Sequence, residues 1–418
     1  MLRRLSRRGT VLAGTVLAGG ALAVALAAGP AVSASAAPLD SVRDQQQWVF
    51  SMLNVVPAWS LSKGSDVTVA VIDSGVDPDV SDLTNSVRRG DDFTNLSTPR
   101  SNPNWGQHGT WMASIIAGHG DGFDDGDGII GVAPDAKILS IRVIPDTTAP
   151  GYKKYDGEPE STIQAELAAG IMEAVHAHVQ VISMSIGYSA PSGAVLAALQ
   201  DAYSQGIVLV ASSGNSGNND EQHTRSGNHG WAPVSFPAEY PGVLGVGAVT
   251  IDRQPTSFSS GNLSVQVAAP GKAVPAQGRS GQYYTVSGTS PACALVAGVA
   301  ALIKSKYPGI SPAKVMQALT TTAQQPLGGA GGYNVLTGFG IVNADAALVK
   351  AGKLVGEHPA RSQVALSAHF GGGAAAVPAA PVGPRGSAAL VLFVLLALVS
   401  LAAGGGGLAA LRRRSDRG

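Results

Sequence analysis

The feature that most constrains the fold is an alternation of apolar, strand-like runs with helical stretches across residues 66–322. Nearly every position of these runs is apolar, which is typical of strands that are buried on both faces. Strands that alternate with helices build a parallel sheet with helices packed on it. The sequence therefore predicts an α/β domain with a mostly parallel central sheet and helices on both faces. The predicted strands are Val67–Ile72, Ile138–Val143, Val179–Met184, Ile207–Ala211 and Val243–Val249.

The helical stretches lie between and after these strands. They are Trp111–Ala117, Ser161–Ala177, Ala194–Ser204, Pro291–Lys306 and Pro312–Thr322. The last two each follow a serine, and Ser-Pro is typical of a helix N-terminus because serine caps and proline suits the first helical position. We therefore expect Ser290 to be the N-cap of the helix that starts at Pro291.

The N-terminus has the pattern of a secretory signal peptide. Four arginines precede the apolar run Val11–Ala28, and Ala34-Ser35-Ala36 is a small-residue cleavage site, so we expect a signal peptide over residues 1–36. An uncleaved N-terminal anchor is the alternative. Residues 37–64 form a short arm that is too small to fold alone and should pack on the domain that follows. The arginines are Arg3, Arg4, Arg7 and Arg8.

The C-terminal part indicates a membrane anchor. Residues 387–411 are uncharged and apolar over a length that can span a bilayer. The arginines that begin the tail 412–418 place it in the cytoplasm. The folded domain, 65–351, is then joined to the span by an Ala/Gly/Pro linker, 352–386. These features predict a single-pass protein of the cell membrane, bound to the membrane by one C-terminal transmembrane helix, with its domain outside the cytoplasm.

Charge and cysteine content argue against nucleic acid binding and against an intramolecular disulfide. The chain has 28 Lys+Arg and 28 Asp+Glu, so no basic surface favours nucleic acid as a partner. Cys293 is the only cysteine, so no intramolecular disulfide can form. The Asp/Gly-rich stretch 121–128 could bind calcium, but its spacing fits no defined calcium motif, and a solvated loop is favoured. No metal and no cofactor is assigned.

Three polar residues fall at strand ends and helix starts, which is where the functional residues of an open parallel sheet usually lie. Asp73 ends the first strand, His108 begins a helix in a Gly-Thr context, and Ser290 begins another. Serine, histidine and a carboxylate are the groups of a nucleophilic triad. From the residues alone, an ordinary helix cap is the favoured interpretation of Ser290, and His108 can equally be a structural histidine.

A fourth candidate is Asn215, in the loop that follows the strand 207–211. A side-chain amide beyond a buried strand can point into a cleft and donate a hydrogen bond to an oxyanion. Because Asn and Gly are also turn residues, a plain turn is the alternative.

Taken together, four segments resemble the four signatures of the subtilisin-like serine proteases. The resemblance extends from about Val67 to Ala347 and implies a subtilisin-like fold and hydrolysis of protein or peptide substrates. It implies Asp73, His108 and Ser290 as the catalytic triad and Asn215 as the oxyanion partner. The segments are Val71–Asp77, His108-Gly109-Thr110, Ser213-Gly214-Asn215 and Gly288-Thr289-Ser290, in this order.

The resemblance also matches Ser185-Ile186-Gly187 to the backbone segment that pairs with substrate. Two departures stand near the site. Ala294 replaces a proline that the family usually has, and the bulky Trp111 could either narrow the cleft or pack inward.

The signal peptide, arm, linker and single span together resemble the mycosins, membrane-anchored subtilases of type VII secretion systems. This resemblance implies a protease beside a secretion complex. Two alternatives remain open: a mainly structural scaffold of such a complex, and a dedicated peptide-processing protease outside any type VII system.

Overall fold

The computed structural model describes residues 35–36, 42–121, 127–217, 232–326 and 332–356. The predicted span, the cytoplasmic tail and nearly all of the predicted signal peptide and linker lie outside these residues. Most of the acidic loop also lies outside them. Within the described ranges, no helix is long and apolar enough to cross a membrane.

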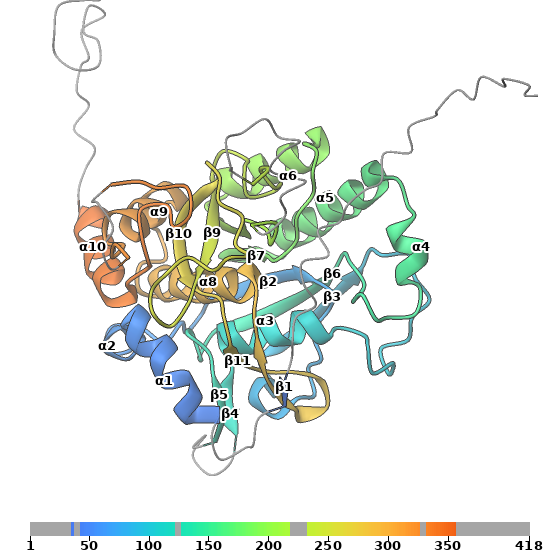
Figure 1. Ribbon diagram of the computed structural model, residues 1–418, viewed down its shortest axis with the longest axis horizontal. Helices are drawn as coiled ribbons and strands as arrows, with labels where there is room; N and C mark the ends of the chain where they lie inside the picture. The colour runs from blue at the N-terminus through green and yellow to red at the C-terminus, as the bar shows by residue number, and fades with distance from the viewer. Residues whose placement is uncertain (1–34, 37–41, 122–126, 218–231, 327–331, 357–418) are drawn as a thin grey trace, which may run out of the picture. The chain divides into compact units, whose positions relative to one another are not determined.

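The centre of the domain is a seven-stranded sheet in the order β10-β9-β8-β7-β2-β6-β3. Every neighbouring pair is parallel, which confirms the predicted sheet (Figure 1). The strands are β2 (Thr68–Asp73), β3 (Val87–Asp92), β6 (Lys137–Arg142), β7 (Val181–Met184), β8 (Val208–Ser212), β9 (Val243–Val249) and β10 (Val265–Pro270).

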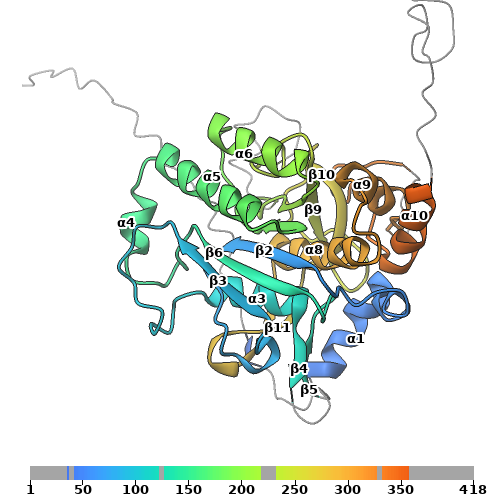
Figure 2. The same cartoon turned by 180° about the vertical axis from the view of Figure 1, so that it is seen from behind.

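Helices cover both faces of this sheet (Figures 1 and 2). Successive side chains of a strand point to opposite faces. On β2, accordingly, Val69 and Val71 join the hydrophobic core under α3 and α8, whereas Ala70 and Ile72 join the core under α5 and α6. The helices are α3 (Gln107–Ala117), α5 (Glu160–His176), α6 (Gly193–Ser204) and α8 (Thr289–Lys306). They match the predicted ones closely.

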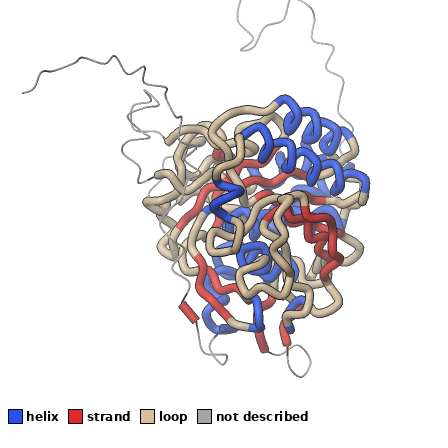
Figure 3. The backbone as a smooth tube through the Cα atoms, turned by 90° about the vertical axis from the view of Figure 1, so that its right-hand side faces the viewer, coloured by secondary structure: helices blue, strands red, loops and turns tan. Residues whose placement is uncertain are grey.

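Smaller elements lie around the sheet, and Figure 3 shows the helices, strands and loops from the side. A three-stranded sheet has the order β1-β12-β11, and β4 pairs with β5 as a hairpin. These elements are β1 (Ser35–Ala36), β4 (His119–Asp121), β5 (Asp127–Ile130), β11 (Val274–Gln277), β12 (Tyr283–Val286), α2 (Val55–Ala58), α4 (Tyr152–Asp156), η2 (Ser81–Leu83) and η4 (Arg279–Gly281).

The C-terminal part of the domain is helical and extends further than the sequence suggests. α9 spans Pro312–Thr321, and α10 spans Ala344–Gly356. α10 thus includes residues 352–356, the start of the predicted linker, because its buried apolar face continues to Leu354.

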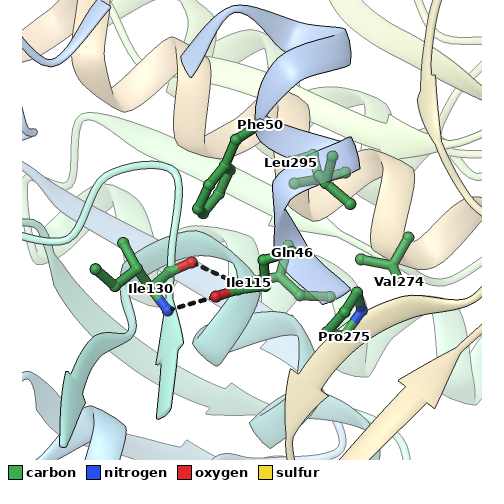
Figure 4. A pocket seen from close by; sticks show the side chains of 8 residues that line it. Gln46, Phe50, Ile115, Ile130, Val274, Pro275 and Leu295 are labelled. Carbon is green, nitrogen blue, oxygen red and sulfur yellow. Dashed lines mark hydrogen bonds between the residues drawn. The ribbon is translucent and has the colours of Figure 1, made fainter. Parts of the chain in front are cut away.

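The N-terminal arm packs on the domain as expected, through α1 (Val42–Leu53). The Gln46 amide exchanges two hydrogen bonds with the Ile130 backbone: Nε2 donates to the carbonyl at 2.8 Å, and Oε1 accepts from the N–H at 3.1 Å (Figure 4). Phe50 packs edge-on against Trp59. The small pocket in Figure 4 lies at this contact, and none of its lining residues belongs to the predicted site.

Candidate active site

The structure joins Asp73 and His108, which are 35 positions apart in the chain. β2 ends at Asp73, α3 begins one residue before His108, and the ring Nδ1 lies 2.8 Å from Asp73 Oδ1 and 3.0 Å from Oδ2. Asp73 is fully buried, whereas the His108 side chain is 23% exposed. A carboxylate at Nδ1 holds the proton there and leaves Nε2 as the ring atom able to accept a proton.

Opposing influences set the pKa of His108. Burial disfavours the charged imidazolium and would lower the pKa, but the charge and hydrogen bond of Asp73 and the charge of Asp146 raise it. The net pKa lies above the ordinary value of 6.5. The ring is therefore a stronger base than an isolated histidine, which suits a group that must take a proton from a serine.

Ser290 is not the N-cap that the Ser-Pro pattern predicts. α8 begins at Thr289, with Gly288 as N-cap at φ 155°, so Ser290 is the second helical residue. This backbone conformation is rarely open to a residue with a side chain, which explains the glycine. The prediction was wrong because the side chain that caps the first turn of α8 belongs to a residue distant in sequence.

That residue is Asn215, whose Oδ1 accepts hydrogen bonds from the Thr289 N–H at 2.9 Å and the Thr289 hydroxyl at 3.0 Å. With Oδ1 committed to the helix start, the amide Nδ2 is directed elsewhere. The Ser290 N–H belongs to the first turn, whose N–H groups have no partner within the helix. The Asn215 amide and this N–H are two donors of the kind that form an oxyanion hole.

The first turn of α8 lies beside the end of β2. Cys293, one turn after Ser290, is fully buried. Its thiol pKa is raised to about 12, chiefly by burial and also by the nearby Asp73 charge.

Among the described residues no hydrogen bond joins the Ser290 hydroxyl to the His108 ring. In enzymes without substrate such bonds often tighten only when substrate binds.

The predicted substrate-binding segment also lies beside Ser290. Ser185-Ile186-Gly187 follows β7, and the Ser185 hydroxyl donates to the Ser290 carbonyl at 3.3 Å. A Cβ at Gly187 would lie 2.3 Å from Ser235 Oγ, so a larger residue there would require the Ser235 hydroxyl to rotate away. Pairing with substrate stays a prediction for this segment.

Trp111 packs inward. The residue is 9% exposed, and its ring meets Tyr284 edge-on, with centroids 5.4 Å apart. The His108 ring lies 6.1 Å away, also edge-on. Trp111 therefore forms part of the packing that supports the first turns of α3.

Sequence reasoning missed Asp146, which lies in the loop after β6 and accepts hydrogen bonds from the backbone at the start of α3. Its position offered a usable sign. Like Asp73, it closely follows a buried strand, and parallel strands bring their carboxyl ends to one edge of the sheet.

Comparisons with known proteins show the family to which the chain belongs. The model of the subtilase family matches residues 64–347. Subtilisin DY of Bacillus licheniformis is 35% identical over 285 residues, 68% of this chain and 92% of that protein. Mycosin-1 of Mycobacterium tuberculosis is 33% identical over 335 residues, 72% of each. A solved structure of MycP1, described as a serine protease and an essential component of the type VII (ESX-1) secretion system, matches with a TM-score of 0.61. It is 31% identical and covers 76% of this chain and 92% of that one.

Proposed function

Because this chain belongs to the subtilase family and is a subtilisin-like serine endopeptidase, we propose that Asp73, His108 and Ser290 carry out its hydrolysis of peptide bonds. The observation that carries the assignment is the pair of hydrogen bonds that the two Asp73 carboxylate oxygens accept from His108 Nδ1. They hold the imidazole in the tautomer that a general base needs.

In the proposed reaction, Ser290 Oγ attacks the scissile carbonyl while His108 Nε2 takes the hydroxyl proton. Asp73 stabilises the imidazolium that forms. The carbonyl oxygen becomes an anion and accepts hydrogen bonds from the Asn215 amide and the Ser290 N–H. The imidazolium then donates its proton to the leaving amine, and water cleaves the acyl-enzyme by the same route in reverse.

The first test is Ser290→Ala in the full-length protein. We expect turnover of peptide substrates to fall by about 10⁴-fold or more, because nucleophile and base act as a unit. The thermal unfolding curve should stay unchanged, since the Ser290 hydroxyl caps nothing. A variant that folds and keeps its peptidase rate would refute the assignment.

We also propose that the enzyme is anchored in the cell membrane by residues 387–411, with its catalytic domain outside the cytoplasm, and that it works with a type VII secretion system. The apolar span with its arginine stop and the signal-peptide pattern support the anchoring. The similarity to mycosin-1 and to MycP1 supports the secretion link.

Measuring type VII secretion in the organism that encodes the chain distinguishes a catalytic role from a scaffold role. If proteolysis is the contribution, a deletion strain and a Ser290→Ala strain should show the same secretion defect. A defect in the deletion strain alone would favour the scaffold. Normal type VII secretion in both strains would favour a peptide-processing protease outside such a system.

A further inference from the structure

The helix that carries His108 has no cap of its own. The N-cap position of α3 is Gly106, at φ 76°, which has no side chain to accept a hydrogen bond. Asp146 takes this role from the loop after β6: Oδ2 accepts the Gln107 N–H at 3.0 Å, and Oδ1 accepts the His108 N–H at 2.9 Å. A carboxylate at a helix N-terminus also interacts favourably with the helix dipole. The backbone of the proposed base is therefore held by a carboxylate other than Asp73.

Ser74 links the two carboxylates. Its hydroxyl donates to Asp146 Oδ1 at 3.1 Å and accepts the Gly109 N–H at 3.1 Å, while its own N–H donates to Asp73 Oδ1 at 2.6 Å. Asp146 is 9% exposed and receives three hydrogen bonds, from one hydroxyl and two backbone N–H groups. An ionised carboxylate is purely an acceptor, so these donors match the charged form.

Two negative charges thus act on the His108 ring, those of Asp73 and Asp146. The charged residue nearby on β6, Arg142, pairs with a carboxylate of β3 at 2.6 Å. On α8 the Cys293 thiol stays neutral at physiological pH, because burial raises its pKa to about 12. The net pKa of Asp146 lies above its usual value, because burial and the Asp73 charge raise it more than His108 and the Gln107 N–H lower it.

We propose that Asp146 is a positioning residue of this active site. It anchors the N-terminus of α3 so that the His108 ring stays against Asp73, and its negative charge favours the imidazolium formed when the ring takes the Ser290 proton. Asp146 contacts the backbone of the base rather than its ring. The proposal rests on the proposed function, because it requires His108 to be the base.

The test is Asp146→Asn in the full-length protein, with kcat and KM for a peptide substrate measured across the pH range of activity. The amide keeps the shape and can still accept one N–H, but the charge is lost. We expect kcat to fall about tenfold to a hundredfold from misplacement of the base, with little change in KM. In the plot of kcat against pH, the acid limb should move to lower pH. Removing an anion lowers the pKa of His108, so the ring stays neutral in more acidic solution.

Two variants separate positioning from mere stability. Asp146→Glu keeps the charge, so its acid limb should stay near that of the wild type even if kcat falls. Asp79→Asn removes an exposed carboxylate, 83% accessible, and should change neither kcat nor the position of the acid limb. A purely structural role would lower the fraction of serine that reacts with a fluorophosphonate probe but would leave the acid limb in place.

The proposal is overturned if Asp146→Asn keeps kcat per reactive serine within about twofold, or if its acid limb does not move. Should that variant fail to fold, Asp146→Ser, which retains a capping hydroxyl without charge, must show the same shift. Ser290→Ala separates the two hypotheses. Activity retained there refutes the proposed function, whereas an inactive Ser290→Ala beside an unaffected Asp146→Asn refutes only the role of Asp146.

Discussion

Two helices of this domain begin with the same Ser-Pro pair and use it in opposite ways. At α9, Ser311 is the N-cap, its hydroxyl accepts the Lys314 N–H at 3.4 Å, and Pro312 is the first helical residue. At α8, Ser290 lies inside the first turn, and the cap comes from Asn215, 74 positions away from Thr289 in the chain.

The difference separates a structural serine, Ser311, from the proposed nucleophile, Ser290. A hydroxyl that caps a helix is committed to the backbone. At α8 a distant amide supplies the cap, so the Ser290 hydroxyl is free for chemistry and keeps neighbouring N–H donors beside it. The contrast predicts opposite effects at the two serines. Ser290→Ala should remove activity without loss of stability, whereas a change at Ser311 should lower stability without loss of activity.

After Ser290→Ala, the largest effect expected from breaking this arrangement is at Asn215. Asn215→Ala removes both the cap on Thr289 and the proposed oxyanion donor, and we expect kcat to fall about a hundred- to a thousandfold. The measurement is kcat and KM for the same peptide substrate, with KM nearly unchanged because the donor acts mainly in the transition state.

Asn215→Asp is the matched control for the cap. Its carboxylate can still accept the Thr289 N–H, but it offers no donor and repels the oxyanion. Stability should therefore recover towards the wild type while kcat stays at least as low as in Asn215→Ala. Recovery of kcat in the Asp variant would mean that Asn215 acts only as a cap.

A smaller effect is expected at Gly288. An added Cβ would lie 3.4 Å from Asn215 Nδ2, an ordinary contact, so the cost of Gly288→Ala comes from its backbone at φ 155°. We expect the free energy of unfolding to fall by about 1–3 kcal/mol and kcat to decrease as the first turn of α8 shifts. Urea denaturation measures the first quantity. Gly309→Ala, which meets no neighbouring atom within 4 Å, should change neither quantity; equal effects at both positions would contradict this explanation.

The smallest effect is expected at Ser311. Ser311→Ala removes a helix cap and should lower the free energy of unfolding by about 1 kcal/mol. Because α9 contributes no residue to the proposed site, kcat should not change. A loss of activity greater than the loss of folded protein would break the contrast between the two Ser-Pro helices.

Sequence reasoning predicted the central strands and the main helices because apolar periodicity reports burial directly. It missed β3, where the edge position leaves Arg88, Arg89 and Asp91 exposed and removes the apolar signature. It also missed Asp146, because a position after a buried strand indicates the edge of the sheet but not the distant helix start that the carboxylate caps.

The sequence by itself determined the layered α/β architecture and the candidates for the reactive groups, since hydrophobic patterning and the order of Asp73, His108, Asn215 and Ser290 can be read directly from the chain. Only the tertiary structure decided where α8 begins, which carboxylates surround His108, and that the Ser290 hydroxyl does not cap its helix. The physical reason is that buried helix ends must find hydrogen-bond partners, and here Asn215 and Asp146 supply them from distant loops.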